Sequence, residues 1–144
     1  MRVRDVLAGK GSTVATVAPT ATIVEVVAAL AEHNIGALVV TEDGSGVAGI
    51  VSERDVVRAL HAVGPGLLAQ PVSGIMTSEV NTCGPTDEIQ ALAKTMTDGR
   101  FRHMPVVVDG ALAGIVTIGD IVKNRIDELE TERHQLVDYI SSSG

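Results

Sequence analysis

The sequence predicts an α+β fold built from two similar halves. A Gly-Ile-Val-Ser-Glu-Arg-Asp-Val string at residues 49–56 returns as Gly-Ile-Val-Thr-Ile-Gly-Asp-Ile at residues 114–121, which keeps glycine, hydroxyl and aspartate in register. Around each string, short apolar runs typical of strands alternate with runs whose apolar residues recur at helical spacing. With 144 residues, 45% of them apolar, the chain can bury the core of one domain or of two small fused lobes.

The first long helix of each half is indicated by apolar residues three and four positions apart. In the first half this stripe begins at Ile23, directly behind Thr22 and Glu25, whose types and spacing form a capping box. The same stripe returns in the second half from Ile89 to Met96. We therefore expect one amphipathic helix at the same place in each copy.

Three short strands are expected in each half, because runs rich in Val and Ile are bounded by Pro, Gly and Asp. Asp109-Gly110 between two apolar runs is a strong hairpin signal. The second helix is expected to begin at Ser52 in the first half and at Thr117 in the second, where it runs on toward Ile140, so each half has the order β-α-β-β-α. The expected strands are Thr13–Val17, Ala37–Thr41 and Val47–Val51, then Glu79–Cys83, His103–Val108 and Ala111–Val116.

The repeat divides the chain into four parts. Residues 1–63 form the first repeat and residues 72–125 the second, with a linker rich in Gly and Pro at 64–71. Residues 126–144 form a helical extension that ends in a disordered-looking Ser-Ser-Ser-Gly tail. At the start of each copy, residues 3–7 align with residues 72–76, and the loop that follows is three residues shorter in the second copy.

The last helix carries apolar residues at alternating spacings of four and three, which is the pattern of a short coiled-coil seam. Arg133 occupies the one seam position that is not apolar. Two interpretations stay open at equal weight: the helix lies on its own domain, or it contacts another subunit. The apolar members of the seam are Val122, Ile126, Leu129, Leu136 and Ile140.

Composition excludes several classes of protein. The net charge of −7 argues against a broad nucleic-acid surface, and with only Phe101 and Tyr139 as aromatic residues there is no platform for stacking bases. No apolar stretch approaches the roughly 20 residues that a membrane-spanning helix needs. The single cysteine, Cys83, fits a reducing compartment. We expect a cytoplasmic protein that binds neither nucleic acid nor membrane.

No catalytic or metal-binding motif stands out. The four histidines show no ligand spacing among themselves or with Cys83, so no metal site is expected. The sequence has no phosphate-binding Walker loop, no nucleophile elbow and no dinucleotide-binding glycine fingerprint. An enzyme is therefore not expected, and neither is a catalytic cofactor.

Two β-α-β-β-α units, each ending in Gly-Ile-Val-Ser/Thr-x-x-Asp, resemble the CBS domain, which is named after cystathionine β-synthase and usually occurs in tandem pairs. Further matching residues are Ile75-Met76-Thr77 at the start of the second copy and the Met104-Pro105-Val106 stretch in its middle. The resemblance covers nearly the whole chain and implies a stand-alone pair. It implies two repeats packed about a pseudo-two-fold axis, a flat homodimer of pairs, and two clefts that hold adenosine-containing ligands.

By this resemblance the chain is a non-catalytic sensor of an adenine nucleotide, with AMP, ADP, ATP and NAD all compatible, that signals to an unknown regulated protein by a change of conformation. Asp55 and Asp120 would accept hydrogen bonds from ribose, with Ser52 and Thr117 near the phosphates. Arg54 would lie beside the first pocket, where it pairs either with phosphate or with Glu53 or Asp55, and Gly119 takes its place in the second copy. Arg102 and His103 would also reach phosphate, and Gly36 stands opposite them in the first copy. The adenine slots would be lined by Val14, Ile35, Ala37 and Ile50 in one copy and by Val80, Phe101, Met104 and Ile115 in the other, and Pro105 is also expected among the nucleotide-binding residues.

Two alternatives compete with this hypothesis. Ser52 with Asp55, and Thr117 with Asp120, have the types and spacing of helix caps, so a structural protein with empty clefts would also carry them. A binder of another adenosyl ligand, such as S-adenosylmethionine, would use the same pockets. Because Arg102, His103 and Pro105 are replaced by Gly36, Ala37 and Val39 in the first copy, we expect two clefts of unequal affinity.

Overall fold

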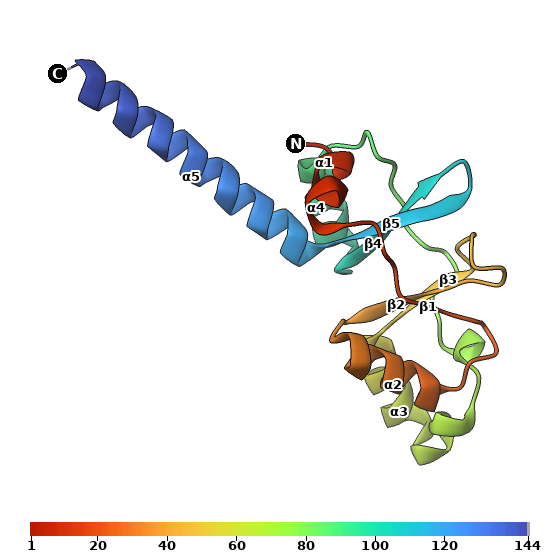
Figure 1. Ribbon diagram of the computed structural model, residues 1–144. Helices are drawn as coiled ribbons and strands as arrows, with labels where there is room; N and C mark the ends of the chain where they lie inside the picture. Colours follow the sequence, from red (N-terminus) through yellow and green to blue (C-terminus); the bar gives the residue numbers. More distant parts are fainter. Residues whose placement is uncertain (144) are drawn as a thin grey trace.

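The chain forms two joined lobes, one above the other in Figure 1, and one long helix projects from the upper lobe. The computed structural model describes residues 1–143. The expected α+β class with two copies of the same unit is confirmed. The helices are α1 (Val3–Lys10), α2 (Ile23–His33), α3 (Glu53–Val63), α4 (Ile89–Gly99) and α5 (Ile118–Ser143), with short 3-10 helices at Pro65–Ala69 and Val72–Gly74; the strands are β1 (Thr16–Val17), β2 (Ala37–Val40), β3 (Gly49–Ser52), β4 (His103–Val108) and β5 (Ala111–Thr117).

The first lobe is built on a three-stranded sheet, in which β1 pairs in parallel with β2 and β2 pairs antiparallel with β3. All four residues of β2 are buried, which explains why this strand is a continuous apolar run. The expected strand at 13–17 is only two residues long, and the one expected at 47–51 begins at Gly49. The turn before β3 is shaped by Asp43, whose carboxylate accepts hydrogen bonds from the amides of Ser45 and Gly46; these bonds also lower the pKa of Asp43.

The helix boundaries follow the capping signals of the sequence. Thr22 and Glu25 form the expected capping box in front of α2. At the other end, Asn34 closes α2 in the left-handed conformation at φ 51°, and Arg100 closes α4 in the same way at φ 58°. Asn34 and Arg100 are equivalent positions of the duplication, so both copies leave their first helix by the same backbone turn.

The second lobe contains the β4–β5 hairpin, turned by Asp109-Gly110 with φ values of 51° and 79°, as the sequence predicts. The prediction of a strand at Glu79–Cys83 is wrong. Only Cys83 pairs there, with its amide donating to Pro105 and its carbonyl accepting from Val107. The segment cannot follow one sheet edge because its start is held by the other lobe, where Thr77 and Ile50 exchange hydrogen bonds of 2.9 and 3.0 Å.

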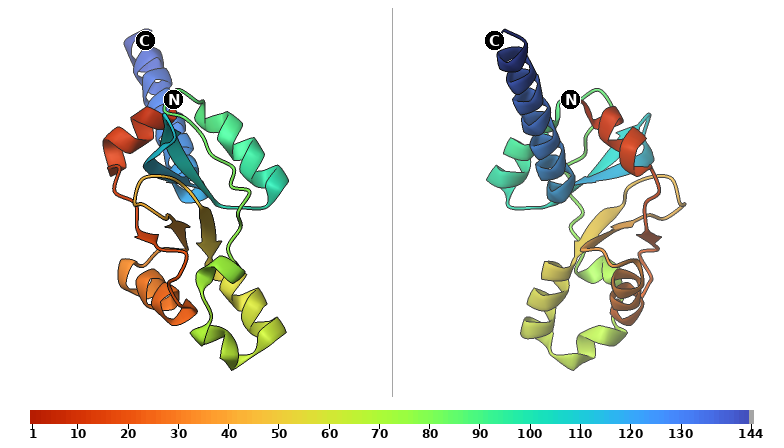
Figure 2. Two further views of the ribbon diagram at one scale, coloured as in Figure 1. Left: turned by 90° about the vertical axis from the view of Figure 1, so that its right-hand side faces the viewer. Right: turned by 60° about the vertical axis from the view of Figure 1, so that its left-hand side comes forward.

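The opening segment of each copy packs on the lobe of the other copy. Helix α1 precedes the first lobe in sequence, yet Val3 and Val6 belong to the buried core around Met104 and Val116 of the second lobe. In return, Val72 lies in the core of the first lobe, and the neighbouring Ile75 and Met76 pack against that core. Figure 2 shows α1 beside the hairpin of the second lobe in both views. The two lobes are thus tied together by an exchange of equivalent segments.

The repeated glycine of each string makes room for the exchanged segment. A Cβ atom on Gly114 would come within 2.8 Å of the side chain of Leu7. A Cβ atom on Gly49 would come within 2.7 Å of the sulfur of Met76 and 2.9 Å of the carbonyl of Thr77. Leu7 and Met76 are equivalent in the duplication, so the glycine is required by a contact that both copies make.

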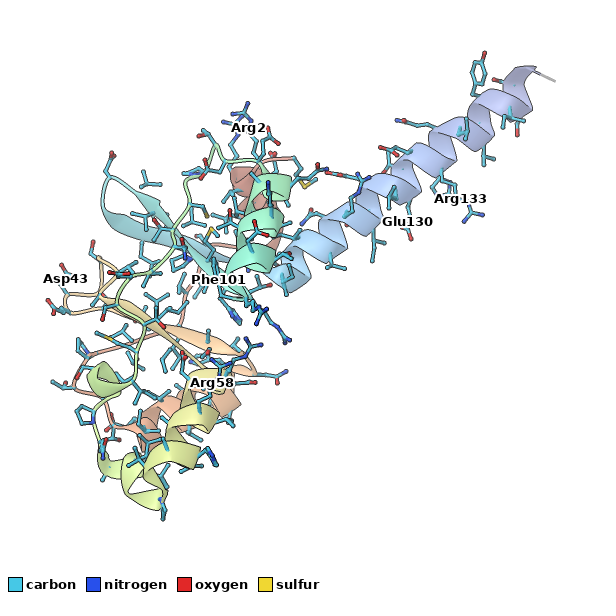
Figure 3. All side chains as sticks on the ribbon, turned by 180° about the vertical axis from the view of Figure 1, so that it is seen from behind. Arg2, Asp43, Arg58, Phe101, Glu130 and Arg133 are labelled. Carbon is cyan, nitrogen blue, oxygen red and sulfur yellow. The ribbon has the colours of Figure 1, made fainter. Side chains whose placement is uncertain are left out.

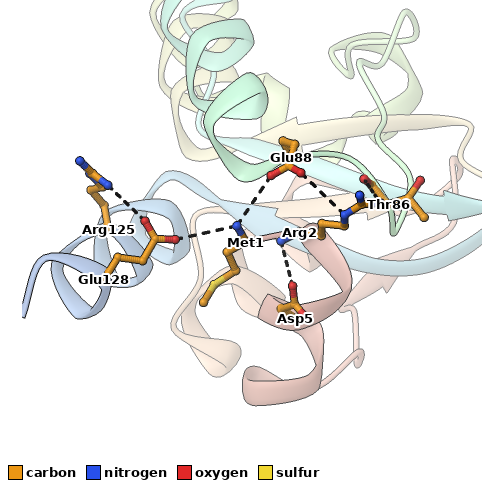
Figure 4. A network of polar contacts seen from close by, with 7 residues as sticks. All are labelled: Met1, Arg2, Asp5, Thr86, Glu88, Arg125 and Glu128. Carbon is orange, nitrogen blue, oxygen red and sulfur yellow. Dashed lines mark hydrogen bonds and ion pairs between the residues drawn. The ribbon is translucent and has the colours of Figure 1, made fainter. Parts of the chain in front are cut away.

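Helix α5 begins on the second lobe and then leaves it. Ile121 is buried in the core of that lobe, and the chain's own amino terminus lies 4.0 Å from Glu128 and 3.7 Å from Glu88 (Figure 4). The sequence predicts a disordered tail from residue 141, but α5 continues to Ser143; Gly144 lies outside the described residues. No helix of the described chain is long and apolar enough to cross a membrane. The cytoplasmic location stays a prediction.

We predict that Gly49→Ala lowers the free energy of unfolding by about 1–3 kcal/mol, because the added methyl group meets a backbone carbonyl that cannot move freely. Urea denaturation measures the change. Gly74→Ala is the matched control, since nothing lies within 4 Å of a Cβ at that position. Equal stability of the two variants would contradict the tight packing at Gly49.

Candidate functional site

A cavity of about 420 Å³ lies between the lobes and is lined by residues of both copies. Figure 3 labels Phe101 of the second copy and Arg58 of the first on the two facing sides. The repeat assigns the candidate residues to two separate clefts, one for each copy, whereas this cavity is lined by candidates of both copies. Ten of the candidates line it: Gly36, Ala37, Ile50, Ser52, Arg54, Asp55, Val80, Phe101, Arg102 and His103.

Asp55 is fixed at the edge of this cavity by the cap of α3. Its Oδ2 atom accepts hydrogen bonds from the amide of Ser52 at 2.9 Å and from the hydroxyl of Ser52 at 3.0 Å, and the Asp55 amide donates to that hydroxyl at 3.3 Å. The structural interpretation of this pair as a capping box is therefore confirmed. All hydrogen bonds to this carboxylate within the described chain fall on Oδ2, which leaves Oδ1 available to a ligand.

Four arginines line the cavity together with three carboxylates, those of Glu53, Asp55 and Glu79. Arg54 donates from Nη1 to the carbonyl of Arg100 at 3.1 Å, so a side chain of the first lobe binds the backbone of the second across the cavity. The arginines are Arg54, Arg58, Arg100 and Arg102. Guanidinium groups at this density favour an anionic ligand, since they bind phosphate oxygens in bidentate fashion.

His103 lies half-buried at the start of β4, against Gly36 of the other lobe. A Cβ atom on Gly36 would come within 3.3 Å of the imidazole, so a glycine is needed opposite the ring. Burial lowers the pKa of His103 below its ordinary value of 6.5; the carboxylates of Glu53 and Asp120 act in the opposite direction, and Arg102 and Lys10 act with burial. The neutral imidazole is therefore the favoured form at neutral pH.

The second aspartate of the repeated string has a different environment. Asp120 caps α5 with Thr117, as Asp55 does for α3 with Ser52, but its Oδ2 atom also pairs with Nζ of Lys10 at 2.6 Å. Lys10 is the last residue of the exchanged helix α1. The two copies are thus alike in their caps, but of the two aspartates Asp120 alone forms an ion pair within the described chain.

Eight candidates do not line the cavity around Asp55, and one of them, Ile115, is partly buried in β5. Met104 and Pro105 are buried in β4, and Val14 and Ile35 are partly buried. Gly119 is exposed at the start of α5. Thr117 and Asp120 complete the set, and the structure holds them in the cap described above.

Seven residues that line the cavity are not among the candidates predicted from the sequence. Arg58 follows Arg54 by one helical turn, and that spacing is a signal that could have found it. The others required knowledge of which segments face each other across the lobes. They are Glu53, Thr77, Glu79, Asn81, Gly99 and Arg100.

The described residues contain no cluster of three or more side chains able to hold a metal ion. Cys83 is buried, and burial raises the pKa of its thiol to about 11, so the reactive thiolate is disfavoured at neutral pH. The site therefore offers charge and shape to a ligand and no activated nucleophile among the described residues.

A model of the CBS domain matches the chain at residues 3–62 and again at 72–127. The chain belongs to the CBS domain family. The two matches cover both lobes, and the chain is a tandem CBS domain pair. Stand-alone CBS domain proteins are typically regulatory modules and not catalysts.

The chain is similar to CBS proteins from bacteria and plants. The crystal structure of the CBS-domain containing protein ATU1752 from Agrobacterium tumefaciens is 46% identical, with a TM-score of 0.84 over 87% of this chain and 99% of that one. The CBS domain-containing protein CBSX3, mitochondrial, of Arabidopsis thaliana is 37% identical over 83% of this chain. The match spans only 60% of the length of the plant protein.

Two similar CBS structures contain adenosine compounds. The CBS domain protein PAE2072 from Pyrobaculum aerophilum, complexed with AMP, is 31% identical with a TM-score of 0.73 over 83% of this chain and 89% of that one. The CBS domain pair of protein MJ0100, in complex with 5-methylthioadenosine and S-adenosyl-L-methionine, is 26% identical with a TM-score of 0.79 over 89% and 98%. These two relatives therefore bind adenosyl ligands.

We predict that acid weakens the CBS pair through His103. Because its folded-state pKa lies below the unfolded value of about 6.5, the contribution of His103 to the free energy of unfolding is complete above that pH and is lost as the pH falls through the folded-state pKa. Urea denaturation at about pH 8 and about pH 5 should show a smaller loss for His103→Gln than for the wild type. His134→Gln, at an exposed position of α5, is the control; an unchanged loss in His103→Gln would contradict the prediction.

Proposed function

We propose that this CBS pair is a regulatory module that binds an adenine nucleotide in the cavity between its lobes. The observation that carries the proposal is the position of Asp55. Its carboxylate is held by Ser52 through one oxygen, while the other oxygen remains available at the edge of a cavity lined by four arginines. A fixed carboxylate beside cations suits a ligand that has both vicinal hydroxyls and phosphates.

Each part of a nucleotide has a chemical counterpart in the cavity. Oδ1 of Asp55 is available to accept hydrogen bonds from the ribose hydroxyls. The apolar side chains of Ala37, Ile50 and Val80, together with the ring of Phe101, suit adenine. The arginines suit phosphates, and because there are four of them we expect ATP to bind more tightly than AMP.

The lobes supply different groups to the ligand, and this gives a means of regulation. Asp55 and Arg58 come from the first lobe, and Phe101 and Arg102 come from the second. A ligand that contacts both lobes favours the arrangement in which they are closest, so occupancy shifts the population of conformations. This mechanism needs no catalysis.

The ion pair between Lys10 and Asp120 supports unequal clefts. A ribose at Asp120 would compete with the ammonium group of Lys10, which already lies 2.6 Å from the carboxylate. We therefore propose that the nucleotide prefers the cleft of Asp55. S-adenosyl-L-methionine is the second candidate ligand, because a related CBS domain pair is in complex with it.

Calorimetric titration of the ligand-stripped protein with AMP, ADP, ATP, NAD and S-adenosylmethionine tests the proposal. We predict binding of at least one nucleotide and a loss of about ten-fold or more in affinity for Asp55→Ala, since charge-assisted hydrogen bonds are removed. Asp120→Ala is the matched control, because it removes the same cap in the other copy; its affinity should stay within about two-fold of the wild type.

Three outcomes of this titration would overturn the proposal. If none of the five compounds binds, the clefts are empty and the chain is a structural or interaction protein. If S-adenosylmethionine alone binds, the ligand class is wrong. If Asp120→Ala loses as much affinity as Asp55→Ala, the site is not the cavity of Asp55.

A further inference from the structure

The long helix α5 is amphipathic, and its apolar face has no cover within the described chain. Its first turns are anchored, since Ile121 is buried and Glu128 lies near the amino terminus. Residues 129–143 extend for roughly 22 Å beyond that anchor at 1.5 Å per residue. Figure 1 shows this part standing clear of both lobes, so neither lobe can cover it.

The apolar residues of this face follow a heptad repeat from Val122 to Ile140. Its apolar members are between 47% and 61% exposed, which is far from the burial that such side chains reach in a core. In heptad notation Ile126 and Ile140 occupy the a positions, with Leu129 and Leu136 at d. Val122 continues the seam as a d position at the base of the helix.

We propose that α5 pairs with α5 of a second copy of this chain as a parallel, in-register, two-stranded coiled coil. Ile at a with Leu at d is the combination that favours two parallel strands. Arg133 occupies the remaining a position, where a single polar residue fixes register and strand number at some expense of stability. Its long side chain can reach solvent from a dimer seam more easily than from the centre of a larger bundle.

The charges beside the seam select the parallel orientation. In a parallel pair, Arg125 at a g position faces Glu130 at the following e position of the other copy, and Arg133 lies beside Glu132 of the other copy. In the antiparallel register that keeps all six seam positions, Glu130 would face Glu130 of the other copy. Glu132 would likewise face Glu132 of the other copy. The parallel pair thus makes attractive contacts where the antiparallel pair makes repulsive ones.

Cysteine cross-linking tests the orientation and the seam together. In a Cys83→Ala background, Leu136→Cys should be cross-linked between two chains by a short bismaleimide, because equivalent d positions meet in a parallel pair. Thr131→Cys is the control on the same helix, at the f position that points away from the seam, and should not be cross-linked. Both sites lie on the projecting part of α5, so neither change disturbs a lobe. No product at residue 136, or equal product at residue 131, would overturn the proposal.

Charge exchange tests the register. Arg125→Glu should weaken dimerisation roughly five-fold, because it places like charges opposite each other in both symmetric pairs. Adding Glu130→Arg should restore the wild-type dimer, as measured by sedimentation equilibrium. This rescue is specific for the contact between copies, since Arg125 pairs within its own helix with Glu128, which the second change does not repair. A double variant as weak as Arg125→Glu would overturn the proposed register.

Discussion

The exchange of opening segments between the two copies is the contact on which the rest of the structure depends. Each copy alone lacks part of its core: the second lobe is completed by Val3 and Val6 of α1, and the first by Val72. A lobe of about 60 residues buries too little surface to be very stable by itself. Burial of the segment that belongs to the other copy therefore stabilises both lobes and holds them together.

The same exchange creates the site and its asymmetry. After the segment at residues 72–76 has packed on the first lobe, the chain pairs Thr77 with that lobe and Cys83 with the other, so the residues between them run along the cavity. Glu79 follows the exchanged segment of one copy and lines the cavity, whereas Lys10 of the other exchanged segment pairs with Asp120. The two equal caps therefore differ: Asp120 has a paired cation, and Asp55 has none within 4.0 Å among the described residues.

Local signals in the sequence predict local structure well. The hairpin at Asp109-Gly110 and the capping boxes at Thr22 and Ser52 have the structure that their residue types predict, because neighbours in sequence make these contacts. The exchange could not be predicted in this way, since nothing in the repeat shows which lobe receives α1. For the same reason the sequence groups the candidate residues by copy and gives no sign of Arg100, whose carbonyl accepts a hydrogen bond from Arg54 across the cavity.

The exchange is tested most directly by nuclear Overhauser contacts between methyl groups and glycine protons in the labelled protein. The structure predicts contacts from the methyl groups of Leu7 to the α protons of Gly114, and from the methyl group of Met76 to those of Gly49. Each contact joins one copy to the other. Contacts from Leu7 to Gly49 and from Met76 to Gly114 would show that each copy keeps its own opening segment, and would contradict the account.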